Sequence, residues 1–348
     1  MKRLLPLLCL ALSACTTVEY YAQVVGGHLE LMRLSVPIEQ TLREPGTPEA
    51  LRTRLEHIQE IRNFAVSELN LPDNGSYRRY ADIGRPYVIW NVFAAPEFSV
   101  KPVESCFPFA GCVSYRGYYS EDGAKRYAAR LARKGDDVYV GGVPAYSTLG
   151  WFDDPVLSTF ARYPDAEVAR LLFHELAHQV VYVTNDTMFN ESFAVAVEEE
   201  GVKRWLDRRG TAEQRTQYQA FEQRRRQVVA LVLKYRGELD AFYREPLALE
   251  ERRAGKARLF ARMRADYGAL KASWGGFAGY DRLFAEPNNA LLASIATYTE
   301  LAPGFRALLA AEGGDFGRFY AAARKLAKMP AAERREALGA DAPSTKPE

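Results

Sequence analysis

The chain has 348 residues, of which 48% are hydrophobic and 26% are charged, as is typical of a globular protein with one or two domains. Its formal net charge of +2 lacks the basic excess of nucleic-acid-binding proteins, so we expect no nucleic acid among its partners.

The N-terminus has the features of an export signal. Two basic residues precede an apolar stretch, residues 4–12, that is too short to span a bilayer permanently. The tetrapeptide LSAC, which ends at Cys15, resembles the lipobox of bacterial lipoproteins, in which the cysteine is lipidated. The alternative is conventional cleavage after Ala14, which the large Leu12 disfavours. We therefore expect residues 1–14 to be a signal peptide and the lipid to hold the protein on the cell-envelope membrane, facing the periplasm.

Two cysteines remain outside this segment, Cys106 and Cys112. In an oxidising periplasm they can form a disulfide that closes a short loop. The alternative is a pair of metal ligands, which the five-residue spacing and the lack of a neighbouring histidine disfavour.

The hydrophobic pattern predicts a mixed α/β region followed by a helical one. In chain order it predicts helices at 18–34 and 48–69, strands at 87–93 and 111–119, a helix at 121–134 and a strand at 137–140. From Thr211 to about Lys328 the pattern is helical almost throughout, with breaks at proline and glycine residues. We expect an α/β catalytic region at 15–210, a helical region at 211–338 and a disordered tail at 339–348.

The segment His174-Glu175-Leu176-Ala177-His178 fits the pattern H-E-x-x-H, in a chain with only four histidines. We expect Asp165 to cap a helix over residues 166–183 that carries it. On a helix, His174 and His178 share one face and can bind a single zinc ion, and Glu175 at the edge of that face can act as general base and acid. The alternative, two histidines satisfied inside a helical core, is disfavoured by the complete motif.

A catalytic zinc also needs a third protein ligand. The segment NESFA at residues 190–194, which opens a second predicted helix, resembles the N-E-G-F-A segment of zinc aminopeptidases of the gluzincin group. That resemblance implies Glu191 as the third ligand and Glu198, two helical turns on, as a residue that supports the site. The twelve residues between His178 and Glu191 form a shorter connection than in those enzymes. The alternative for Glu191 is a carboxylate favoured by the helix dipole.

Together with residues 142–150 and 288–290, these motifs make the chain similar to zinc aminopeptidases found among proteobacterial lipoproteins. The resemblance implies an α+β fold with a zincin-like metallopeptidase core, a mixed sheet and a mostly helical C-terminal region. It also implies a peptide substrate. The strand at 137–140 is the candidate that would pair with that substrate.

The sequence departs from the gluzincin aminopeptidases in one respect. It has no G-x-M-E-N run, whose glutamate holds the substrate's amine in those enzymes, and only Asp153 and Asp154 follow in the same region. Among twenty tyrosines, Tyr298 and Tyr146 are the candidates for stabilising the transition state, and a buried structural role is the alternative for each. We predict a zinc peptidase, favouring an aminopeptidase, with an endopeptidase or a non-catalytic zinc-binding lipoprotein as alternatives.

Overall fold

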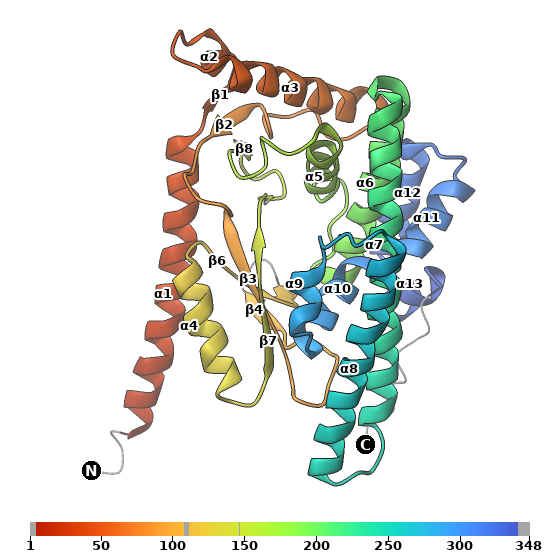
Figure 1. Cartoon of the computed structure of the whole chain (residues 1–348). Helices are drawn as coiled ribbons and strands as arrows, with labels where there is room; N and C mark the ends of the chain where they lie inside the picture. The colour runs from red at the N-terminus through yellow and green to blue at the C-terminus, as the bar shows by residue number, and fades with distance from the viewer. Residues whose placement is uncertain (1–4, 108–110, 146, 340–348) are drawn as a thin grey trace.

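A computed structural model describes residues 5–107, 111–145 and 147–339, with side chains described from residue 18 onward. The fold is α+β, as the sequence predicted, with small sheets enclosed by helices (Figure 1). The N-terminal helices are α1 (Leu5–Leu34), α2 (Ile38–Arg43), α3 (Glu49–Leu69), α4 (Glu121–Ala132), α5 (Asp165–Ala177) and α6 (Thr187–Arg209). The C-terminal helices are α7 (Ala212–Tyr243), α8 (Leu249–Ser273), α9 (Asp281–Ala285), α10 (Asn289–Thr299), α11 (Ala302–Ala311), α12 (Phe316–Ala327) and α13 (Ala331–Ala337).

The strands form three separate sheets. They are β1 (Val36–Pro37), β2 (Arg79–Ala81), β3 (Ile89–Ala95), β4 (Ser105–Phe107), β5 (Gly111–Val113), β6 (Arg116–Tyr118), β7 (Asp137–Val143) and β8 (Val156–Leu157). The largest sheet has the order β6-β3-β7 and is antiparallel throughout, with Asn91 of β3 opposite Gly117 and Gly141. A mixed sheet has the order β1-β2-β8, and β4 pairs with β5 in a hairpin.

The two faces of the β6-β3-β7 sheet meet different partners, because side chains alternate along a strand. Trp90, Val92 and Ala94 pack with the buried alanines and Leu131 of α4 and with Tyr20 of α1. Phe93 on the opposite face packs with Ala290 of α10. This second face is turned toward α5, the helix that carries His174. The sheet therefore lies beside the two histidines.

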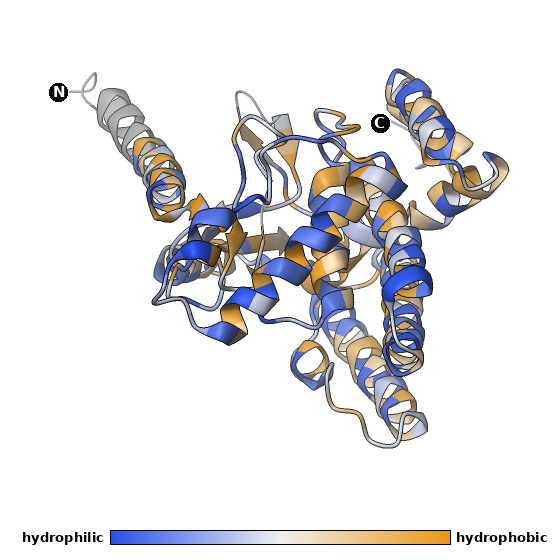
Figure 2. Ribbon diagram, turned by 90° about the horizontal axis from the view of Figure 1, so that it is seen from above, coloured by the Kyte–Doolittle hydropathy of each residue, from blue (hydrophilic) through white to orange (hydrophobic). Residues whose placement is uncertain are grey.

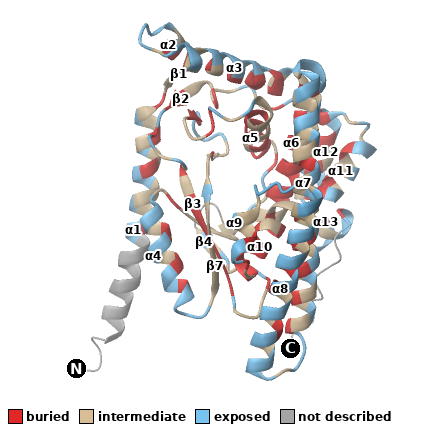
Figure 3. Ribbon diagram, in the orientation of Figure 1, coloured by how far each residue is buried: buried red, intermediate tan, exposed pale blue. Residues whose placement is uncertain are grey.

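The main hydrophobic core lies around α5 and α6, where buried residues concentrate in Figure 3. It includes Phe173 of α5 and Phe193 of α6, and also Phe305 of α11 and Phe319 of α12. Helices α11 and α12 therefore share a core with α5 and α6, whereas α7 and α8 pack on each other in a second cluster that includes Tyr235 and Met263. Viewed from above, the outer helices carry both hydrophilic and hydrophobic residues, as expected for elements with one face toward a core (Figure 2).

The N-terminal helix α1 runs without a break from Leu5 to Leu34 along one side of the molecule (Figure 1). From residue 18 onward, the buried residues of this helix are Tyr20, Gly27 and Leu31. Gly27 lies against the ring of Tyr119, which occupies the space that a Cβ atom would need. In the described part of the chain, no helix has the length and hydropathy of a membrane span.

Several predicted element boundaries were wrong. The helix predicted over 166–183 ends at Ala177, and the residue before it is Pro164 rather than a side-chain cap. Asp165 instead accepts a hydrogen bond from Arg54, so it ties the start of α5 to α3. The strand predicted over 111–119 is split into β5 and β6, which belong to different sheets. The predicted tail, apart from Gly339, lies outside the described residues.

Candidate metal centre

The helix pair α5 and α6 carries the candidate site, and the sequence between the two helices fixes how they meet. Asp186 caps α6 by accepting a hydrogen bond from the backbone nitrogen of Phe189 at 3.1 Å. Arg334 of α13 holds the same carboxylate through its Nη2 at 2.6 Å, and both side chains are buried. The second helix therefore begins at Thr187, one turn earlier than the sequence predicted.

Asn190 clamps the connection between the helices. Its Oδ1 accepts a hydrogen bond from the backbone nitrogen of Val183 at 2.7 Å, and its Nδ2 donates to the carbonyl oxygen of Val183 at 2.8 Å. Ser192 is also engaged, because its hydroxyl accepts a hydrogen bond from the backbone nitrogen of Leu301 at 3.2 Å. Glu191 lies between these two anchored residues, so the first turns of α6 hold its carboxylate toward α5.

Three side chains converge between α5 and α6. Nε2 of His174 lies 3.1 Å from Oε2 of Glu191, and Nε2 of His178 lies 3.6 Å from the same oxygen. The two Nε2 atoms are 3.3 Å apart, and the rings are almost perpendicular, at 87°. One ligand atom from each residue lies within 4.8 Å of the others, so the group can hold a metal ion. Two imidazole nitrogens and one carboxylate oxygen fit a zinc-type donor set.

Glu198 occupies the far side of His174. Its Oε2 accepts a hydrogen bond from Nδ1 of His174 at 2.8 Å, which leaves Nε2 directed at Glu191. Arg170, one turn before His174, lies 3.6 Å from the same carboxylate oxygen. Arg225 of α7 lies 3.4 Å from the other oxygen and also binds Glu199 at 2.5 Å. Glu198 is only 1% exposed, so its charge depends on these cations.

Burial and neighbouring charges act in opposite directions on these groups. Burial opposes the charged form of His174, but the hydrogen bonds to Glu191 and Glu198 outweigh it and raise the pKa of His174 to about 10. Burial would raise the pKa of Glu191, but the charge of His178 and the bonded imidazoles lower it to about 2. Burial raises the pKa of Glu175, and the two imidazoles oppose that shift. The geometry therefore favours a carboxylate at Glu191.

A cavity of about 660 Å³ opens onto this group. His174, Glu175, His178 and Glu191 all line it. Tyr298 of α10 lines it as well, with its ring centroid 6.4 Å from that of His174. A second cavity, of about 720 Å³, lies between α6, α7 and α11, and none of these five side chains lines it.

Two tyrosines that the sequence analysis did not single out, Tyr115 and Tyr182, also line the cavity. Burial raises the pKa of Tyr115 well above its usual value, and the charge of Glu191 raises it further. The same two causes, burial and then Glu191, raise the pKa values of Tyr182 and Tyr298. The three phenols are therefore neutral hydrogen-bond donors beside the metal-binding group.

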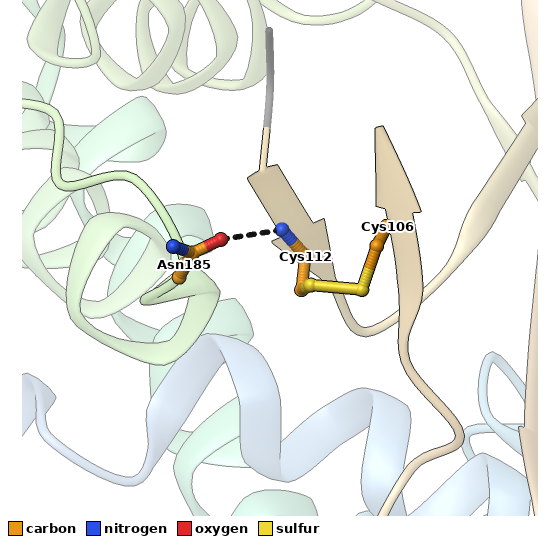
Figure 4. The surroundings of a disulfide bond; sticks show 3 residues. All are labelled: Cys106, Cys112 and Asn185. Carbon is orange, nitrogen blue, oxygen red and sulfur yellow. Dashed lines mark hydrogen bonds between the residues drawn. A yellow bond between two sulfur atoms is a disulfide. The ribbon is translucent and has the colours of Figure 1, made fainter. Parts of the chain in front are cut away.

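The hairpin β4–β5 forms part of the cavity wall and is attached to the connection between α5 and α6. Cys106 and Cys112 form a disulfide across the hairpin (Figure 4). Oδ1 of Asn185 accepts a hydrogen bond from the backbone nitrogen of Cys112 at 2.6 Å. Gly111 packs so closely on Asn185 that a Cβ atom there would clash, and its φ of +73° favours glycine. The hairpin thus places Phe107 and Val113 in the cavity lining.

The structure brings together His174, Glu175, His178, Glu191 and Tyr298, all of which the sequence singled out, and places Glu198 behind His174. Tyr146 lies outside the described residues, and so does the side chain of Cys15. Sequence reasoning missed Tyr115, Arg170 and Arg225. Arg170 had a local signal, since it lies four residues before His174 and so on the same helix face.

The fold and the site together define an α+β protein with a helix-borne His-His-Glu group that can hold a metal ion. A family model described as "Putative aminopeptidase" matches residues 19–338, and the chain belongs to this family. The family supports a peptidase, a hydrolase that acts on peptide bonds. No curated protein and no solved structure matches the chain significantly.

Proposed function

We propose that this protein is a zinc-dependent peptidase with a zincin-like, gluzincin-type centre. The observation that carries the proposal is the convergence of His174, His178 and Glu191 at the floor of a cavity that Glu175 also lines. Family membership supports the peptidase class independently. A purely structural zinc site normally fills all four positions with protein ligands and needs no neighbouring carboxylate in an accessible cavity.

His174, His178 and Glu191 would hold the metal, which when bound supplies Lewis acidity toward a carbonyl oxygen and a water molecule. Glu175 takes a proton from the attacking water and later delivers it to the leaving amine. The phenol of Tyr298 or Tyr115 donates a hydrogen bond to the oxygen on which negative charge develops. Glu198 fixes the ring of His174 through Nδ1, so that Nε2 stays directed at the metal position.

The strand β7 supports the binding of an extended peptide. Strand β3 pairs with β7 along one edge. At the other edge, the carbonyl oxygen of Val138 points away from β3 and accepts a hydrogen bond from Nδ2 of Asn288 at 2.9 Å. Because backbone groups alternate in direction along an antiparallel strand, Val140 and Gly142 also direct theirs away from β3. The backbone groups of Val140 and Gly142 would pair with the substrate backbone.

We also propose that the protein works at the bacterial cell envelope, held to the membrane by a lipid on Cys15. The lipobox-like sequence that ends at Cys15 and the preceding basic and apolar residues support this location. A disulfide between Cys106 and Cys112 fits an oxidising compartment.

The decisive experiment compares wild-type protein with Glu175→Gln for zinc content and for hydrolysis of a peptide library. We expect both proteins to bind one zinc ion, and we expect the variant to lose at least about a hundredfold in kcat/KM because proton transfer is removed. A wild-type protein that takes up no zinc, or a variant with undiminished turnover, would contradict the proposal.

A further inference from the structure

The charges in the cavity are concentrated at its metal-binding end. The charged side chains among its described lining residues are Arg170, His174, Glu175, His178, Glu191, Glu198 and Arg225. Each of them either belongs to the candidate metal centre or is paired within the ion network around Glu198. The remaining described lining residues are uncharged.

No carboxylate among the described lining residues is available for a substrate amine. Glu191 faces the two imidazoles, Glu198 is enclosed by His174 and two arginines, and Glu175 is assigned to proton transfer. Residues 108–110 and 146, which neighbour lining residues in the sequence, are Pro, Phe, Ala and Tyr and add no carboxylate.

The two aspartates that follow β7 do not fill this role either. Asp154 is fully buried, and its Oδ2 accepts hydrogen bonds from the backbone nitrogen and the hydroxyl of Thr148. Asp153 is exposed and packs against Gly75. Neither aspartate lines the cavity. A substrate's terminal ammonium would therefore enter the cavity without an ionic partner, which costs free energy.

The uncharged wall is rich in aromatic side chains. Tyr20 and Tyr21 of α1, Phe107 of β4 and Tyr119 after β6 line the part contributed by the N-terminal half of the chain. The rings of Tyr20 and Phe107 stack at a centroid distance of 5.4 Å, and the guanidinium of Arg116 lies over the ring of Tyr20, 3.8 Å from its centroid. Such a wall offers a large apolar contact surface to a ring or long aliphatic side chain.

We propose that this site cleaves peptide bonds next to large apolar or aromatic residues within a chain or behind a blocked N-terminus, and does not require a free terminal amine. This specificity rests on the proposed peptidase function and refines it. It departs from the aminopeptidase preference that the sequence resemblance suggested, because the described cavity lining holds no unengaged carboxylate for the ammonium of a free N-terminus.

The test uses zinc-loaded protein and one hexapeptide with a central phenylalanine, prepared with a free and with an acetylated N-terminus. We expect mass spectrometry to show internal cleavage beside phenylalanine, with kcat/KM for the acetylated peptide within about twofold of the free one or higher. Substitution of that phenylalanine by lysine or glutamate should lower kcat/KM at least about tenfold. Stepwise loss of residues from a free N-terminus, abolished by acetylation, would overturn the inference.

Binding to the Glu175→Gln protein separates this inference from the proposed reaction. We expect the acetylated phenylalanine peptide to bind this variant at least about tenfold more tightly than its lysine counterpart, whether or not hydrolysis is detected. If no peptide is hydrolysed by the wild type, the proposed function fails, while this affinity order still decides whether the cavity prefers large apolar side chains. Equal affinities for the two peptides would contradict it.

A further substitution, Tyr21→Ala, tests the aromatic wall itself. We expect it to reduce the tenfold preference for phenylalanine over lysine to about twofold or less, while zinc content stays unchanged. The matched control is Phe277→Ala, which removes a 40% exposed ring outside the cavity lining and should leave the preference unchanged. An unaltered preference in Tyr21→Ala would remove this wall from the specificity.

Discussion

Glu191 and Glu198 lie on one helix, seven residues apart, and the structure gives them different partners. Glu191 faces Nε2 of both histidines, whereas Glu198 bonds Nδ1 of His174. The roles proposed for them follow from that difference, because a metal ion held by the two histidines would be within reach of Glu191 but not of Glu198.

We expect Glu191→Ala to lower zinc affinity far more than Glu198→Ala, whose loss should be about 10–100-fold because it acts through the ring of His174. Zinc retained after dialysis against a graded chelator series measures the difference. The matched control is Glu200→Ala on the same helix, because the side chain of Glu200 accepts a hydrogen bond from Arg204 and not from a histidine. Earlier loss of metal from the Glu198 variant than from the Glu191 variant would reverse the two roles.

Asp154 is a buried carboxyl group with one oxygen, Oδ1, that lacks a hydrogen-bond partner among the described residues. Burial raises its pKa to about 7, the charges of Glu175 and Asp153 add to that shift, and the hydrogen bonds from Thr148 oppose it. The native state therefore holds this proton more tightly than the unfolded chain does. The stability it confers is complete below pH about 4 and is lost as the pH rises through about 7.

We expect Asp154→Asn, which cannot ionise, to abolish this loss. Relative to the variant, wild-type protein should lose about 3 kcal/mol in the free energy of unfolding between pH 5 and pH 8. Chemical denaturation at both pH values provides the measurement, with the exposed neighbour in Asp153→Asn as the control. A difference between wild type and Asp154→Asn that does not change with pH would show that Asp154 keeps an ordinary pKa.

At the scale of elements, α7 supports the metal centre from outside the helix pair. Arg225 brings its guanidinium to Glu198, Glu199 and Glu222. Since Glu198 in turn holds His174, a helix of the C-terminal region helps to orient a metal ligand on α5. Arg225 is a positioning residue in this sense and does not contact the metal-binding atoms of His174.

We expect Arg225→Met to weaken zinc binding by about tenfold or more, because the buried Glu198 keeps only Arg170 as a cation and its carboxylate is held less firmly. Arg225→Lys should recover part of the affinity. The adjacent Arg226 is the matched control, since its side chain is 65% exposed and lies 3.9 Å from Glu222. If Arg225→Met and Arg226→Met hold zinc equally well in chelator competition, α7 has no part in positioning the ligand.

The residues of the candidate metal centre could be predicted from the sequence because their spacing is local. His174, Glu175 and His178 lie within about one helical turn, and Glu191 lies in the second turn of the next helix. The helix boundaries were less predictable, because the side chain of Asp186, held by Arg334, caps α6 and begins it at Thr187, earlier than the apolar pattern indicates. Such side-chain contacts to the backbone override the periodicity of hydrophobic residues.

Arg225 and Tyr115 could not be predicted, since each reaches the site through tertiary packing. Arg225 lies 27 residues after Glu198, in a run of three consecutive arginines, and nothing in the sequence distinguishes it from Arg224 and Arg226. Tyr115 lies between two short strands of different sheets, and nothing in its neighbourhood distinguishes it from the other tyrosines. Strands and helices were both predictable from β-rich runs and helical periodicity, in agreement with the α+β class that the resemblance implied, whereas the division of the strands into three sheets was not.

At the scale of the whole molecule, membrane attachment through Cys15 is the remaining prediction. We expect Cys15→Ser protein to stay unprocessed or to appear in the soluble fraction, because the acceptor of the lipid is removed. Fractionation and the mass of the mature chain provide the measurement, with Cys9→Ser inside the predicted signal as a control that remains anchored. Cys15→Ser protein of normal mature mass in the membrane fraction would refute the attachment.

The helix α1 would connect the proposed attachment to the site, because it contains Cys15 and, five residues later, Tyr20 in the cavity lining. At 1.5 Å per residue the two positions are about 8 Å apart along the helix axis. A lipid on Cys15 would thus hold the cavity close to the membrane surface, because almost no flexible linker would separate the two. The protein would scan the bilayer surface in two dimensions, and its substrates would be chains that lie on that surface or emerge from it.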